Sequence, residues 1–173
     1  MVKMNYRQFQ AFANLQSEQI QEVVRAGKPG KIAAGKLLFK QQMLCQQIVF
    51  LLEGEVRISI DTADGEQILS TLKAPTVLGE IGFFSGEPSS ANVTSVTPVR
   101  VLALEFEAFR DRLLQGDAVA GMVLLNMSHA LAKRAANMTR KLSELYAAQE
   151  EIESQASQVQ QASSTIFGEW SFL

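Results

Sequence analysis

The sequence predicts a mainly β protein with flanking helices, in which a double-stranded β-helix, or jelly roll, precedes a long C-terminal coiled-coil helix. Three observations support this fold class. Short runs rich in β-branched and aromatic residues lie between residues 37 and 104, separated by Gly, Pro and Asp. An amphipathic helical pattern precedes these runs, and a proline-free heptad pattern follows them.

The first 30 residues are expected to form N-terminal helices. Their apolar residues recur at spacings of three and four among Gln and Glu, with a break expected near residues 14–17. Gly27, Pro29 and Gly30 end this pattern, because both residue types interrupt a helix.

Residues 31–105 are expected to form the β-roll. The predicted strands are residues 37–40, 47–52, 55–60, 66–72, 91–96 and 99–104. Asp64-Gly65 is the clearest hairpin turn, because Asp-Gly pairs favour the left-handed conformation that tight hairpins need.

Residues 78–93, L-G-E-I-G-F-F-S-G-E-P-S-S-A-N-V, separate the strand-rich part of the chain from its helical part. Gly79-Glu80 can open a tight turn and a short helix whose free N–H groups face an anion. Gly86 and Pro88 then mark a loop. Spacing alone leaves two readings open: a wall of a phosphate-sized pocket, or an ordinary connection between strands.

A short helix is expected at residues 106–116, ended by Gly116, and a long one at residues 117–166, capped by Asp117. The long segment carries an apolar residue every seven positions: Leu124, Leu131, Met138, Leu145, Ile152, Val159 and Ile166. Together with Ala135, Leu142, Gln149, Ala156 and Ser163, four residues after these positions, they form a seam with 4-3 spacing.

The seam predicts a parallel, dimeric coiled coil, so we expect a homodimer through the C-terminal helix. Packing on its own domain is the alternative for the part before about residue 139. Gln149 and Ser163 should weaken the coiled coil while fixing its register. Residues 167–173 form an apolar tail that we expect to dock on the dimer or on a protein partner.

Composition limits the possible partners and surroundings. The chain is 47% hydrophobic with a net charge of −2, so no overall basic charge points to direct nucleic-acid binding. Cys45 is the single cysteine, which excludes an internal disulfide. No apolar run approaches the length of a membrane span, and we expect a cytoplasmic protein with no membrane association.

An enzyme is disfavoured. The jelly roll is also the architecture of metal-dependent cupins, but their sites need several histidines and a carboxylate. His129 is the single histidine, and neither it nor Cys45 has partners in the sequence for a metal or a nucleophilic triad. We therefore expect no catalytic residues and no metal.

Four segments resemble the cyclic nucleotide-binding domain family, which includes catabolite-activator-type regulators and kinase regulatory subunits. They are I-V-F-L-L-E-G-E-V-R-I (48–58), D-G-E-Q-I-L-S-T-L (64–72), the stretch 78–93 and V-R-V-L-A-L (99–104). The resemblance covers roughly residues 6–142. It implies that residues 78–93 are the phosphate-binding cassette, and that the long helix is the C-helix through which such proteins dimerise and transmit a ligand signal.

The resemblance also implies roles for individual residues. Gly79 and Glu80 match the Gly-Glu pair whose carboxylate accepts a hydrogen bond from the ribose 2′-hydroxyl. Further ligand-binding residues implied by it are Ile81 and Gly82, with amides near the cyclic phosphate, the small pair Ser90 and Ala91, and Asn137 and Thr139, facing the base. The implied ligand is cAMP or cGMP.

Ser89 departs from the family pattern, because members that bind a cyclic nucleotide usually carry Arg there. A charge-assisted guanidinium–phosphate pair contributes about 1.5–3 kcal/mol, so its loss could weaken binding by about ten- to several-hundredfold. Arg134 is a possible replacement cation, although a solvated charge on a helix is an equal reading. Gln42 replaces a family glycine.

Two functions remain open. One is a dimeric sensor whose β-roll binds a cyclic nucleotide or another anion, which the presence of Glu80 favours. The other is a degenerate, ligand-free dimeric scaffold, which Ser89 favours. A transcription factor would place a helix-turn-helix after the C-helix, where this sequence has Gln- and Ser-rich coiled coil. A sensor fragment of a longer transcription regulator is therefore a third, weaker reading.

Overall fold

The structure is a computed structural model that describes residues 5–169, with side-chain surroundings up to residue 158. The chain forms two compact units, Met1–Ala130 and Leu131–Leu173. The first contains the sheets and the short helices, and the second is the continuation of the last helix.

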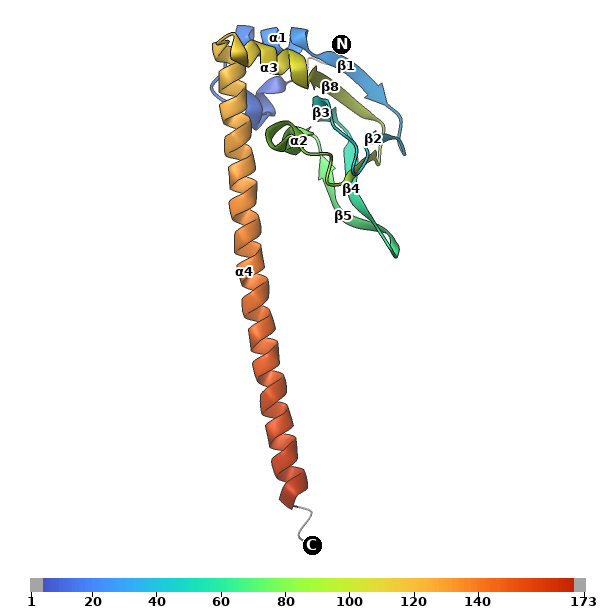
Figure 1. Ribbon diagram of the computed structural model, residues 1–173, viewed down its shortest axis with the longest axis vertical. Helices are drawn as coiled ribbons and strands as arrows, with labels where there is room; N and C mark the ends of the chain where they lie inside the picture. The colour runs from blue at the N-terminus through green and yellow to red at the C-terminus, as the bar shows by residue number, and fades with distance from the viewer. Residues whose placement is uncertain (1–4, 170–173) are drawn as a thin grey trace. The chain divides into compact units, whose positions relative to one another are not determined.

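Within residues 5–130, eight strands form two four-stranded antiparallel sheets (Figure 1). The strands are β1 (Lys28–Ile32), β2 (Leu37–Phe39), β3 (Gln47–Glu53), β4 (Glu55–Thr62), β5 (Gly65–Lys73), β6 (Thr76–Leu78), β7 (Asn92–Ser95) and β8 (Val99–Glu105). One sheet has the order β1-β8-β3-β6, and the other has the order β2-β7-β4-β5.

The helical elements flank this roll. They are two 3₁₀ turns (Tyr6–Gln8 and Gln10–Phe12), α1 (Ser17–Ala26), α2 (Glu80–Ser85), α3 (Phe106–Leu114) and α4 (Ala118–Glu169). The predicted fold class, a β-roll with flanking helices followed by a long C-terminal helix, is confirmed.

Strand β3 lies between two hydrophobic cores, which explains its unbroken apolar run. Alternate residues point to opposite faces of a strand. Ile48 and Phe50 belong to the core shared with the N-terminal helices, α3 and the start of α4. Val49 and Leu51 belong to the core shared with the second sheet. The first sheet is therefore a middle layer, with helices on one face and the second sheet on the other.

The start of α4 is fixed to the body of the first unit. Asp117 caps the helix, accepting hydrogen bonds from the amides of Val119 (2.8 Å) and Ala120 (3.1 Å). Arg112 donates from Nε to the same carboxylate at 2.6 Å. Burial disfavours the charged form of Asp117 and so raises its pKa. The hydrogen bonds from these donors, together with the charge of Arg112, lower the pKa by more, so that it lies below the ordinary value.

The structure corrects two details of the sequence prediction. Strand β1 begins at Lys28, before the expected boundary at residue 30, with Pro29 opposite Leu102. A proline is tolerated there because β1 is an edge strand, where its missing N–H breaks no inner ladder. In the hairpin, Thr62 pairs with Gly65, so the two loop residues are Ala63 and Asp64 and not Asp64-Gly65.

In the second unit, the predicted seam is exposed from Ala135 to Ala156. Met138, Leu145 and Ile152 are each about two-thirds exposed (66%, 66% and 67%). The seam positions Val159, Ser163 and Ile166 lie beyond the described side chains, and the end of the tail lies beyond the described backbone. Within the described residues, no helix is apolar over enough of its length to cross a membrane.

Candidate functional site

The turn between β6 and α2 requires a glycine. Gly79 has φ +81°, in the left-handed region that L side chains disfavour. A Cβ atom at this position would lie 2.4 Å from the carbonyl oxygen of Gln47 and 3.1 Å from Sγ of Cys45. The amide of Phe83 donates to the Gly79 carbonyl at 3.1 Å, which begins α2. Sequence and structure agree that Gly79-Glu80 opens a tight turn and a short helix.

Glu80, the first residue of α2, is 4% exposed. A carboxylate is costly to bury, so its presence there requires compensating interactions or a function. Burial raises the pKa of the neighbouring Cys45 thiol, and the charge of Glu80 adds to the rise. The hydrogen bond from Cys45 Sγ to the Gln47 carbonyl (3.1 Å) opposes it without reversing it. A raised pKa disfavours the thiolate, which is the nucleophilic form of a cysteine.

The other residues of the first turn of α2 differ in their surroundings. The side chain of Ile81 is 50% exposed. The carbonyl of Gly82 accepts a hydrogen bond from the amide of Gly86 at 3.0 Å, which closes the helix. Gly86 has φ +71°, so it ends α2 in the left-handed conformation typical of helix C-termini.

Ser89 is held by the protein itself at all three of its polar groups. Its amide donates to the carbonyl of Met43 (2.9 Å), and its carbonyl accepts from the amide of Gln42 (2.8 Å). Its hydroxyl donates to the carbonyl of Ala91 at 2.8 Å. Of the predicted small pair, Ser90 is exposed and Ala91 is buried. The structure thus brings residues 79–82 into one turn and ties Ser89 to the connection between β2 and β3.

Asn137 and Thr139 belong to the second unit, whereas residues 79–91 belong to the first. Both side chains are exposed. The Thr139 hydroxyl donates to the carbonyl of Ala135 one turn earlier, at 3.2 Å. Their predicted contact with a base therefore stays a prediction.

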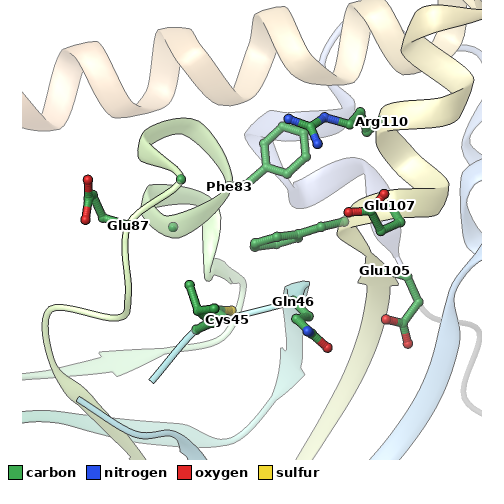
Figure 2. Close-up of a pocket in the computed structure, with 11 residues that line it drawn as sticks. Cys45, Gln46, Phe83, Glu87, Glu105, Glu107 and Arg110 are labelled. Carbon is green, nitrogen blue, oxygen red and sulfur yellow. The ribbon is translucent and has the colours of Figure 1, made fainter. Parts of the chain in front are cut away.

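A cavity of about 340 Å³ is lined in part by residues of α2 and α3, and we call it the α2–α3 cavity (Figure 2). It is lined by Leu44, Cys45, Gln46, Gly82, Phe83, Gly86, Glu87, Glu105, Phe106, Glu107 and Arg110. Figure 2 shows Phe83 on α2, Arg110 on α3, and Glu105 and Glu107 near the start of α3. Three carboxylates and one guanidinium give this cavity a net negative lining.

A second cavity, of about 320 Å³, is also lined by residues 44–46, and we call it the Lys40 cavity. It is lined by Leu38, Phe39, Lys40, Met43, Leu44, Cys45, Gln46, Gln47 and Ser89. Its lining contains one cation, several amide and hydroxyl groups and no carboxylate. Phe39, Cys45 and Gln47 also make the closest approaches to Gly79, so this cavity adjoins the turn before α2 as well as Ser89.

Sequence reasoning missed Lys40, Phe39 and Gln47 as site residues. Their placement depends on the β2–β7 register, which shifts between Leu37 and Phe39. It also depends on the turn after β2, in which Gln42 takes φ +63°. Neither feature has a signal in residue spacing. Among the described residues, no group of three or more His, Cys, Asp and Glu is placed to hold a metal ion.

The architecture is thus a roll of two antiparallel sheets, a short helix that begins with the buried Glu80 directly after Gly79, and a long C-terminal helix. Comparison with known proteins identifies the family: its profile, described as "Cyclic nucleotide-binding domain", matches residues 29–129, more than half of the chain. The chain therefore belongs to the cyclic nucleotide-binding domain family, as the sequence motifs predicted.

Two curated relatives come from different kinds of protein. A cyclic nucleotide-gated potassium channel of Rhizobium etli is 33% identical over 93 residues, covering 54% of this chain and 25% of the channel. A CRP-like cAMP-activated global transcriptional regulator of Mycobacterium tuberculosis is 22% identical over 135 residues, covering 78% of this chain and 58% of the regulator. The chain thus spans between a quarter and three-fifths of the length of these relatives.

Solved structures share the fold. The catabolite activator protein of Thermus thermophilus has a TM-score of 0.70 at 23% identity, over 79% of this chain and 63% of that one. The N-terminal domain of a transcriptional regulator from Streptomyces coelicolor has a TM-score of 0.65 at 27% identity, over 76% and 93%. The regulatory domain of Toxoplasma gondii PKA, crystallised with cAMP, has a TM-score of 0.56 at 23% identity, over 61% and 40%.

Proposed function

We propose that this chain is a non-enzymatic sensor module. In this proposal, a small anion binds beside residues 78–93, and binding alters how α4 associates with a second copy. Cyclic nucleotides are the first candidates for the ligand, because they are the family's namesake and because a PKA regulatory domain of this fold was crystallised with cAMP. A related Xanthomonas campestris regulator is described as c-di-GMP responsive, so cyclic dinucleotides also belong among the probes.

The buried Glu80 carries this proposal. It occupies the first turn of a helix whose entry is fixed by Gly79, with φ +81° and no room for a side chain. The family resemblance assigns to this carboxylate the ribose 2′-hydroxyl.

Isothermal titration calorimetry with cAMP, cGMP and cyclic di-GMP tests the proposal on the wild type and on Ser89→Arg. We expect the wild type to bind at least one of them and Ser89→Arg to bind a cyclic mononucleotide more tightly, because the guanidinium adds a charge-assisted pair with the phosphate. No uptake by either protein at millimolar ligand would contradict the nucleotide form of the proposal.

A ligand-free scaffold is the second candidate, and the hydrogen bonds of Ser89 favour it. Its amide, carbonyl and hydroxyl all have protein partners, so none of them needs a ligand to be satisfied. Binding by Ser89→Arg alone would support this candidate, because it would mean that the pocket shape persists while its phosphate affinity has been lost. A place within a longer transcription regulator is compatible with either candidate.

A further inference from the structure

Lys40 follows the last residue of β2, in a turn attached to the end of the cassette. The amide of Met43 donates to the Lys40 carbonyl at 3.1 Å, which closes this turn. Two hydrogen bonds join the turn to Ser89, from the Gln42 amide to the Ser89 carbonyl and from the Ser89 amide to the Met43 carbonyl. A third runs from the amide of Gln41 to Oδ1 of Asn92 at 2.9 Å. The backbone of Lys40 is thereby fixed relative to residues 89–92.

The other cations of the β-roll are engaged or placed elsewhere. Residues 28–105, which the structure describes throughout, contain seven Lys and Arg residues. Four of them form ion pairs: Lys28 with Glu105, Arg57 with Glu66, Lys73 with Glu55 and Arg100 with Glu53. Of the remaining Lys31, Lys36 and Lys40, Lys40 lines the cavity that contains Ser89, and the other two do not.

The chemistry of the Lys40 cavity suits a monoanion with an apolar body. Leu38, Phe39 and Met43 supply apolar surface, and the amide side chains of Gln46 and Gln47 supply hydrogen-bond donors and acceptors. The lining residues include one cation, Lys40, and no carboxylate, so the charge of the lining favours an anion. In the α2–α3 cavity, three glutamates and one arginine line the space, and Glu105 is paired with Lys28, so that lining suits the same anion less well.

We propose that Lys40 supplies the positive charge that Ser89 does not, and that the module's anionic ligand binds in the Lys40 cavity with its negative group on this lysine. An ammonium on a flexible stem can reach the anion from the neighbouring turn, although it lacks the bidentate geometry of an arginine. This inference rests on the proposed sensor function, whose cassette residues provide the adjoining wall of the cavity.

The test is calorimetry with cAMP, cGMP and cyclic di-GMP at low ionic strength, on the wild type, Lys40→Gln and Lys36→Gln. Lys36 is the matched control, since it is also an exposed lysine without an ion pair in the described structure but does not line the cavity. We expect Lys40→Gln to weaken binding by about tenfold or more, and Lys36→Gln to change it by less than about twofold. Lys40→Arg should retain binding, because it keeps the charge.

A charge-relocation experiment separates this role from a loss of structure. Ser89→Arg places a cation on the cassette itself, so the double variant Ser89→Arg/Lys40→Gln should bind more tightly than Lys40→Gln alone. The dependence of affinity on salt should fall in Lys40→Gln and return in the double variant. Equal urea midpoints for wild type and Lys40→Gln would establish that the fold is unchanged.

Each outcome decides between the proposals. Wild-type binding that Lys40→Gln leaves within about twofold overturns the role of Lys40 and leaves the sensor function standing. Binding by Ser89→Arg but not by the wild type overturns the role of Lys40 and supports the scaffold. No binding by any variant overturns both the role of Lys40 and the nucleotide form of the proposed function.

Discussion

Asn126 ties the start of α4 to the N-terminal segment, because its side-chain amide donates to the carbonyl of Ala13 at 2.7 Å and to that of Ala11 at 3.2 Å. Asn126 is 5% exposed, within the hydrophobic core that includes Phe12 and Val123. One polar side chain thus connects segments more than 110 positions apart in the sequence.

Asn126→Ala should destabilise the first unit by about 1–3 kcal/mol, because it removes both hydrogen bonds and leaves a buried carbonyl without a donor. Urea denaturation followed by circular dichroism measures the change. Asn137→Ala, at an exposed position of the same helix, is the control and should change stability by less than about 0.5 kcal/mol. Equal losses in the two variants would show that the Asn126 hydrogen bonds contribute little.

Gly79→Ala should destabilise the protein by about 3 kcal/mol or more, combining the cost of a left-handed alanine with the clash against the Gln47 carbonyl. Gly86→Ala separates these effects. Gly86 also has a positive φ, of +71°, but a Cβ there has no atom within 4 Å, so only the conformational cost of about 1 kcal/mol remains. Urea denaturation compares the stability of the two variants. If Gly79→Ala lost no more stability than Gly86→Ala, the backbone of β3 at Gln47 would have to move aside at little cost.

The contribution of Asp117 to stability should depend on pH. Its folded-state pKa lies below the ordinary value of 3.8, so the stabilisation is fully present above that value and is lost as the pH falls through the lower, folded pKa. Asp117→Asn should therefore be less stable than the wild type at pH 7, and this difference should shrink below about pH 4. Urea midpoints at several pH values measure it, with the exposed Asp111→Asn as control. A pH-independent difference would contradict the electrostatic account of the cap.

The double variant Leu145→Asp/Ile152→Asp should be a monomer in sedimentation velocity runs. Dimerisation would bury two carboxylates per chain in the apolar seam of the predicted coiled coil, which is unfavourable. The matched control is Ala147→Asp/Ser154→Asp, which places the same charges two residues later, away from the seam. This control should remain a dimer. A dimer in both cases would mean that the exposed seam of the second unit is not the interface.

Much of the fold followed from periodicity, because strand alternation, glycine punctuation and the proline-free heptads each reflect local chemistry. The two strands that were not predicted are β1 and β6. β1 contains Pro29 and Gly30, which usually signal an interruption, and β6 has only three residues. Both are strands because of the partners they pair with, β8 and β3, and not because of their own composition.

The candidate site likewise has residues that could be identified from the sequence and residues that could not. Gly79 and Glu80 could be identified from the sequence because the turn needs a glycine and the helix begins directly after it. The surroundings of Ser89 could not, because its partners Gln42 and Met43 come from a turn more than 40 residues earlier in the chain. That turn holds Gln42 at φ +63°, a left-handed conformation at the position where the family resemblance places a glycine.

Residues 44–46 line both the α2–α3 cavity and the Lys40 cavity. A displacement of this segment would therefore alter both spaces at once. A ligand in one cavity that displaced it would change the affinity of the other cavity for its own ligand, and the effect would be reciprocal.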